Sequence, residues 1–105
     1  ILENNNKLQL PVIPADAYNN GHLFYLICKS LDERDALIQH LKENNIMATF
    51  HYVSLHKSEF YGNEKLLLPH AERYSDCLVR LPFYYELSDA DQEKIISTVL
   101  NFYQE

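Results

Sequence analysis

The pattern of apolar and polar positions along this 105-residue chain predicts three strands and three helices. Residues 22–28 form a continuous apolar run rich in aromatics, which predicts a strand buried on both faces. Residues 46–52 predict a second strand, and residues 78–81, which are followed by Pro82, predict a third. The three runs are well separated along the chain, so other elements must connect them.

The first connection is predicted to be a helix that begins after Ser30. Ser30 and Glu33 have the spacing of a capping box, in which the hydroxyl accepts from a later backbone N–H and the carboxylate reaches back. The helix should end at Asn44 and Asn45, because Asn is the best substitute for Gly in a left-handed cap. Between these ends an apolar stripe at helical spacing consists of Leu37, Ile38 and Leu41.

Two further helices are predicted in the second half of the chain. Pro69 suits the first turn of a short helix that ends at Tyr74 or Cys77. Ser88 is predicted to cap the last helix, whose first turn carries two aspartates that favour its positive end. The core-facing stripe of this last helix consists of Ile95, Ile96, Val99, Leu100 and Tyr103.

The remaining segments are predicted to be extended or looped. Residues 8–13 form a short extended segment, and Asn19-Asn20-Gly21 is a strong turn signal. Residues 56–68 have no clear period, which favours a mobile loop with a turn at Gly62-Asn63. The order of elements predicts an α+β fold, in which a small three-stranded sheet has helices packed on one face.

Composition narrows the class of function. The chain is 47% hydrophobic and 23% charged, with a net charge of −6 and scattered basic residues, which disfavours a nucleic-acid partner. The five histidines and two cysteines have no recognised metal-ligand spacing, and no apolar stretch approaches a membrane span. Cys28 and Cys77 lie in apolar runs, which indicates buried free thiols and a reducing cytoplasm.

The densest polar and aromatic cluster is the sequence from Phe50 to His56, at the end of a predicted strand. His51, Tyr52 and His56 could hydrogen-bond a polar ligand, or the histidines could simply complete the strand end. Ser54 and His56 lack an orienting acid, which argues against a nucleophile pair. Arg80 is an isolated cation within an apolar strand, and it is either a solvated edge residue or an anion-binding residue.

These motifs together resemble the C-terminal small domain of the DegT-type, PLP-dependent sugar-nucleotide aminotransferases. The resemblance begins with the strand at 22–25 and continues through the segment from Ile46 to His56, with Ser54 where the family has proline. It also includes Ala71-Glu72-Arg73, then Arg80-Leu81-Pro82-Phe83-Tyr84, and finally the sequence from Leu87 to Gln92. Within the family, the chain looks most like the TDP-4-oxo-6-deoxy-D-glucose transaminases.

The resemblance implies that residues 1–105 are one small domain of a longer enzyme, with residues 1–7 as the end of the preceding connection. The parent would use pyridoxal 5'-phosphate (PLP), held by a lysine that this chain lacks, so no catalytic residue is expected here. It would transfer an amino group, from glutamate, to the C4 keto group of a nucleotide-linked 4-keto-6-deoxy sugar. His51, Tyr52, His56 and Arg80 are the expected substrate-binding residues.

Further expectations concern the parent and the alternatives to it. The family implies a homodimer or higher homo-oligomer, and Ile1-Leu2-Glu3 resembles the end of an interrupted helix. Two alternatives belong to other classes of function: a stand-alone small-molecule binding module of ferredoxin-like shape, and a structural dimerisation domain.

Overall fold

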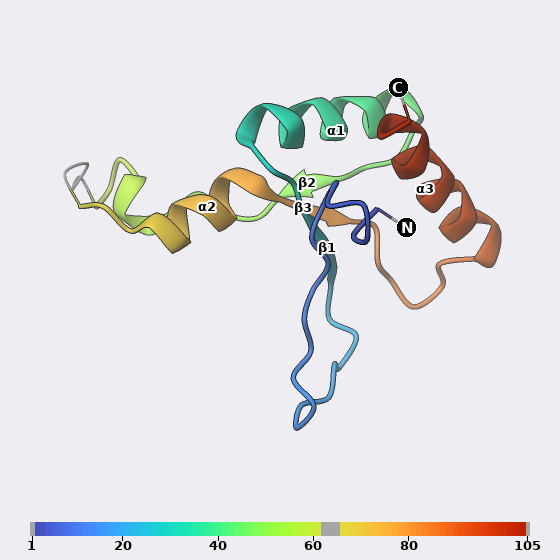
Figure 1. Ribbon diagram of the computed structural model, residues 1–105, viewed down its shortest axis with the longest axis horizontal. Helices are drawn as coiled ribbons and strands as arrows, with labels where there is room; N and C mark the ends of the chain where they lie inside the picture. The colour runs from blue at the N-terminus through green and yellow to red at the C-terminus, as the bar shows by residue number, and fades with distance from the viewer. Residues whose placement is uncertain (1, 62–65, 105) are drawn as a thin grey trace.

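The structure of the protein is a computed structural model that describes residues 2–61 and 66–104. A three-stranded sheet lies at its centre. Figure 1 shows α1 and α3 on one side of the sheet and α2 beyond its end. The elements of the described residues are, in chain order, β1 (Phe24–Ile27), α1 (Leu31–Glu43), β2 (Thr49–Phe50), a 3₁₀ turn (Leu55–Lys57), α2 (Pro69–Cys77), β3 (Leu78–Leu81) and α3 (Asp89–Phe102).

The strand order is β1-β3-β2, and both outer strands run antiparallel to β3. Leu26 pairs with Val79 and Phe24 pairs with Leu81, so these four side chains share one face of the sheet. Tyr25 and Thr49 flank Arg80 on the opposite face. The helices α1 and α3 contact each other over the first face, which confirms the predicted α+β fold.

The two ends of α1 are formed by the residues that the sequence indicates. The Ser30 hydroxyl accepts from the Glu33 N–H at 3.2 Å, while the Glu33 carboxylate accepts from the Lys29 N–H at 2.6 Å. At the other end, Asn45 adopts a φ of +59°. The Ile46 N–H then bonds to the Leu41 carbonyl, and the Asn45 N–H bonds to the Lys42 carbonyl. This pair of bonds is a Schellman motif.

The core lies between the sheet and the two long helices. Leu37, Leu41 and Val79 are fully buried at its centre. From α3, Ile95 and Val99 are buried, Leu100 and Tyr103 are half-buried, and Ile96 is exposed. The predicted apolar stripe of α3 is therefore wider than the face that is buried in the core, because it includes the exposed Ile96. Both cysteines are buried and free, as the sequence predicts.

The strand predictions were too long, and burial on both faces of the first strand holds only in its second half, where Leu26 and Ile27 are both buried. The first strand covers only Phe24–Ile27, and Phe24 at its start is exposed. The second strand is reduced to Thr49–Phe50, and within residues 2–61 and 66–104 it pairs with β3 alone, at the edge of the sheet. Residues after Phe50 leave the sheet to contact α2 instead.

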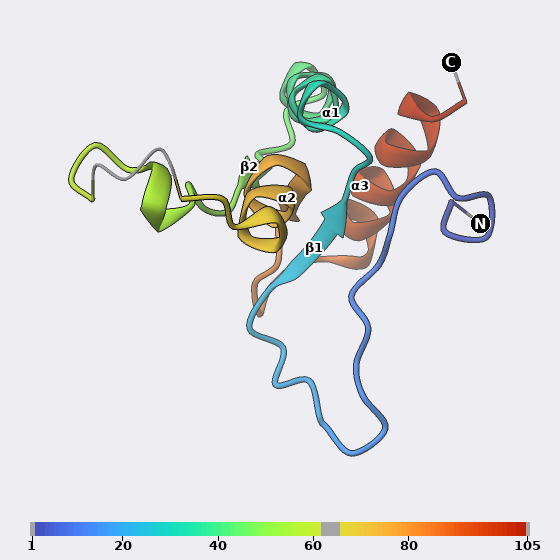
Figure 2. The ribbon, with the colours of Figure 1, turned by 60° about the vertical axis from the view of Figure 1, so that its left-hand side comes forward.

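Two loops connect parts of this fold. The segment between Gln9, which forms a bridge with Ile27, and β1 projects from the body as a long loop (Figures 1 and 2). At its end Gly21 has a φ of +68° and its N–H bonds to the Asn19 side chain, which confirms the turn there. The loop predicted over 56–68 contains part of the 3₁₀ turn, and Gly62-Asn63 lies outside the described residues.

Candidate functional site

The residues that follow β2 are held against α2 by hydrogen bonds. The Ser54 side chain is buried, and its hydroxyl donates to the Ala71 carbonyl at 3.0 Å. The Ser54 N–H donates to Oγ of Ser75 at 3.2 Å. Serine therefore fixes this segment through bonds to α2, at the position where the family pattern has proline.

Ser75 connects three parts of the structure. Its hydroxyl donates to the Tyr52 carbonyl at 2.7 Å and accepts from the Ser54 N–H. Its own carbonyl accepts from Nη1 of Arg34 at 3.2 Å, which connects α2 to α1. The backbone of the candidate site is thus joined to both helices through one residue of α2.

Arg34 supports the same region from α1. The residue is 8% exposed, and its Cζ lies 5.0 Å from the centroid of the Phe50 ring, which is a cation–π geometry. Its Nη2 forms an ion pair with Asp35 at 2.8 Å. Sequence reasoning missed Arg34, although a signal was present. Arg34 precedes Leu37 by three positions and Ile38 by four, so it is a charged residue within an apolar helical stripe.

His56 faces α2 and is not open to solvent. Its side chain is 3% exposed, and its Nε2 lies 3.0 Å from Oε1 of Glu72. The same oxygen accepts from the Leu68 N–H, and Lys57 Nζ lies 3.3 Å from the other oxygen. The hydrogen bond from His56, and then that from Leu68, hold the pKa of the Glu72 carboxyl below its usual range. Sequence reasoning placed Glu72 in the family pattern without giving it this partner.

His51 and Tyr52 are the accessible residues of the segment. Tyr52 is 70% exposed, and His51 is half-buried. Their rings lie against each other, with centroids 3.4 Å apart and planes inclined by 49°. They present a phenol and an imidazole at the end of β2, where a ligand can reach both groups.

Arg80 occupies a different position from the other three candidates. It lies in β3, half-buried, with Tyr25 and Thr49 as its neighbours on the two outer strands. The structure therefore brings His51, Tyr52 and His56 onto one segment braced by α2, and it places Arg80 on the face of the sheet opposite α1 and α3. Arg80 as a substrate-binding residue stays a prediction.

Metal sites and membrane spans are two further classes of feature that a chain of this composition could contain. Within 2–61 and 66–104, no three side chains of His, Cys, Asp or Glu converge in a way that could hold a metal ion. None of the helices in this part of the chain has the length and apolar character needed to span a membrane.

Comparison with known proteins identifies the type of fold. The aminotransferase TlmJ from Streptoalloteichus hindustanus is 30% identical, with a TM-score of 0.85 over 94% of this chain and 27% of its own. DesV from S. venezuelae, solved in complex with a ketimine intermediate, is 28% identical with a TM-score of 0.86 and the same two coverages. NtdA from Bacillus subtilis, solved with bound cofactor PMP, is 19% identical, and its TM-score of 0.81 shows the shared fold.

This chain thus spans about a quarter of the length of the structures that it matches. The model of the DegT/DnrJ/EryC1/StrS aminotransferase family matches residues 1–100, nearly the whole sequence. The order of the His-Tyr segment, the α2 helix and the Leu81-Pro82 strand end agrees with this match. The chain belongs to the DegT/DnrJ/EryC1/StrS aminotransferase family.

Proposed function

We propose that the parent protein is a PLP-dependent transaminase that aminates the C4 keto group of a nucleotide-linked 4-keto-6-deoxy sugar, with glutamate as amino donor. This chain would be its C-terminal small domain. The observation that carries the proposal is the His51–Tyr52 pair, with Tyr52 exposed and His51 half-buried, which a hydrogen-bonded brace holds at the end of β2 in a chain of this family. The sequences Phe50-His51-Tyr52 and Arg80-Leu81-Pro82-Phe83-Tyr84 favour TDP-4-oxo-6-deoxy-D-glucose as the substrate within the family.

The described residues of this chain do not themselves form a PLP site. A Schiff-base lysine is made reactive by desolvation or by a neighbouring charge. All the described lysines are exposed to solvent, and Lys57 is paired with Glu72. We therefore assign the cofactor to the part of the parent that this chain does not cover, where it supplies the electron sink for transamination. The lysines in question are Lys7, Lys29, Lys42, Lys57 and Lys94.

The chain's own contribution is recognition and orientation of the sugar nucleotide. The Tyr52 phenol can donate and accept, and a neutral His51 ring can do the same through its two nitrogens. Such groups bind sugar hydroxyls or a diphosphate without burying an unpaired charge. Holding the sugar in one orientation favours reaction at a single carbon, because the bound geometry selects which group meets the cofactor.

His56 has a different part in this proposal from that of His51. Since Nε2 of His56 is engaged by Glu72, the ring orients the segment after β2, and the substrate contact falls to His51 and Tyr52. Arg80 is retained as a candidate for an anionic part of the substrate. Its guanidinium suits a phosphate, and its strand carries no other basic residue.

The two alternative functions differ from the proposed one in whether the chain needs the rest of an enzyme in order to act. A stand-alone binding module or a dimerisation domain would act without the remaining three-quarters of a longer enzyme. The family match and the 27% coverage of TlmJ and DesV both favour a domain that works inside such an enzyme.

The test is an assay of the full-length parent, loaded with PLP, with L-glutamate and TDP-4-keto-6-deoxy-D-glucose. We expect equimolar 2-oxoglutarate and 4-amino sugar nucleotide, identified by mass spectrometry and NMR. A 3-keto sugar nucleotide serves as the control for the position of amination. Turnover of the 3-keto compound alone would contradict the proposed substrate, and no turnover of any keto sugar would contradict the proposed class.

A further inference from the structure

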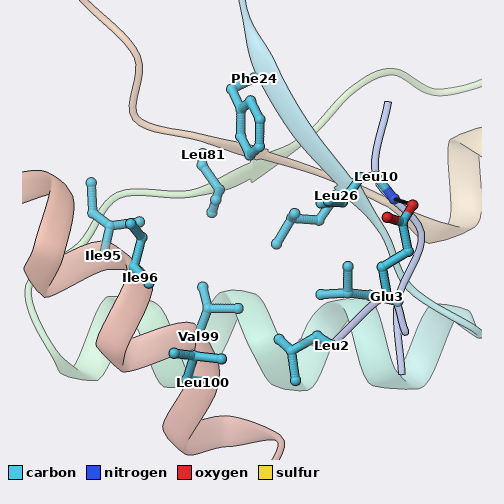
Figure 3. Close-up of a pocket in the computed structure, with 11 residues that line it drawn as sticks. Leu2, Glu3, Leu10, Phe24, Leu26, Leu81, Ile95, Ile96, Val99 and Leu100 are labelled. Atoms are coloured by element: carbon cyan, nitrogen blue, oxygen red, sulfur yellow. Dashed lines mark hydrogen bonds between the residues drawn. The ribbon is translucent and has the colours of Figure 1, made fainter. Parts of the chain in front are cut away.

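An apolar groove runs along α3 on the side away from the candidate site. Figure 3 shows it between α3, the edge of the sheet and the N-terminal segment. Its volume is about 300 Å³, and Glu3 is its only charged lining residue among those described. A second hollow of about 230 Å³ adjoins it and shares the lining residues Phe24, Leu81, Ile95 and Ile96.

The groove exists because α3 carries more apolar surface than the core uses. Ile95 and Val99 are buried, at 8% and 6% exposure. Ile96 and Leu100 are four residues apart and form a second apolar row beside them. Ile96 is 43% exposed, and Phe24 across the groove is 39% exposed. A helix face that meets only water is normally polar, so this second row indicates a covering partner.

The opposite wall of the groove has the hydrogen bonds of a helix end. The Lys7 N–H bonds to the Leu2 carbonyl and the Asn6 N–H bonds to the Glu3 carbonyl, both at 2.9 Å. Asn6 has a φ of +52°. This is the Schellman pattern that also ends α1, with an asparagine in the left-handed position in both cases. Leu2 therefore has the backbone bonds that a residue in the last turn of a helix makes at a Schellman end, and it lines the groove.

We propose that a helix of the parent protein, which ends at residues 2–5, covers this groove and buries Ile96, Leu100 and Phe24. The relatives TlmJ and DesV are covered over only 27% of their length, so much of the parent is outside this chain. Leu2 lines the groove, so a helix that ends at this residue has a high effective concentration there. Residues three or four and seven positions before Leu2 share its helix face, and we expect them to be apolar.

The inference rests on the longer parent of the proposed function, and it is independent of the substrate. The first test is hydroxyl-radical labelling of the full-length protein, read by mass spectrometry, with Phe60 and Tyr85 as exposed references at 99% and 103%. We expect Phe24 to be labelled at least about fivefold more slowly than its 39% exposure in this chain implies. Labelling at the rate that this exposure implies would overturn the proposal.

The second test compares two lysine variants of the parent that start from equal exposure. Ile96 is 43% exposed on α3, and Leu31 is 42% exposed at the start of α1, so neither change disturbs the core of this chain. We expect Ile96→Lys to lower the Tm by roughly 5 °C and to restore labelling of Phe24, because a charge would be buried without a partner. Leu31→Lys should do neither, and equal effects of both variants would overturn the proposal.

Dilution distinguishes the covering helix from a second copy of the protein. Protection that is supplied by the same polypeptide does not depend on concentration, whereas protection by another copy is lost when the oligomer dissociates. We expect protection of Phe24 to persist in the monomer, and its loss on dilution would overturn the proposal. None of these measurements uses the substrate, so a wrong substrate assignment leaves their outcome unchanged.

Discussion

Nε2 of His56 lies 3.0 Å from Oε1 of Glu72, and the histidine side chain is 3% exposed. The two residues are 16 positions apart, and their contact joins the segment after β2 to the first turn of α2. Of the residues in the His-Tyr segment, His56 therefore faces the protein, while Tyr52 faces solvent at 70% exposure. This difference separates the residues that orient the site from those that can touch a ligand.

The first prediction concerns the acid stability of this contact. The pKa of Glu72 lies below its ordinary value of 4.5 because the carboxylate accepts from His56 and from the Leu68 N–H. A carboxyl with a lowered folded-state pKa contributes stability that is present above its unfolded pKa and lost as the pH falls through the folded pKa. We expect the urea midpoint to fall as the pH drops below 4.5, and to fall less steeply in Glu72→Gln. The same slope in both proteins would show that Glu72 has no such role.

The second prediction concerns Ser75. Replacing Ser75 with Ala leaves the Tyr52 carbonyl and the Ser54 N–H without their partner, which should cost about 1–3 kcal/mol of unfolding free energy. The control is Ser97→Ala, since the Ser97 hydroxyl donates only to the Lys94 carbonyl on an exposed turn of α3. That change should stay within about 0.5 kcal/mol. Urea unfolding measures both, and an equal loss in the two variants would remove Ser75 from its bracing role.

The third prediction concerns the end of α1. Asn45 has a φ of +59°, which costs a β-branched residue about 1–2 kcal/mol and costs Gly nothing. Asn45→Val should therefore be destabilised by roughly that amount, while Asn45→Gly should lie within about 0.5 kcal/mol of the wild type. Both are measured by urea unfolding, and a Val variant as stable as the Gly variant would rule out the left-handed cap.

The fourth prediction concerns the thiols. Burial raises the pKa of Cys28 to about 11 and also raises the pKa of Cys77. The thiolate is the reactive form, so both should be modified slowly at pH 8 in the native protein and quickly in denaturant. A raised folded-state pKa contributes stability that is present below the unfolded value of 9.0 and lost as the pH rises toward about 11. Rapid labelling of two thiols in the native state would contradict the buried assignment.

The helices could be predicted because their signals are local. Ser30 and Asn45 mark the ends of α1, and Leu37 and Leu41 mark its buried face, all within one segment. Strand lengths depend on partners distant in sequence, and in the described part of the chain β2 is short, with β3 as its one partner over two residues. The pattern of apolar residues at 46–52 holds no information about that partner.

The proximity of the candidate site residues was predictable from the sequence, whereas the direction in which each side chain faces was not. The sequence places His51, Tyr52 and His56 near one another, since all lie within one short segment. That His56 is turned toward Glu72 follows from a contact between segments that α2 brings together. Likewise, the burial of Arg34 follows from its contacts with Phe50 and Ser75, which the periodicity of α1 does not contain.

The central claim is that His51 and Tyr52 recognise the sugar nucleotide in the parent enzyme, and kcat/KM for the sugar nucleotide in Tyr52→Phe and His51→Ala tests it most directly. We expect a loss of about 0.5–1.5 kcal/mol in transition-state stabilisation for each, or about 1.5–3 kcal/mol where the partner is the diphosphate. The Tm should change little, because Tyr52 is 70% exposed and neither side chain belongs to the core. Unchanged kcat/KM in both variants, with or without a fall in Tm, would contradict the claim.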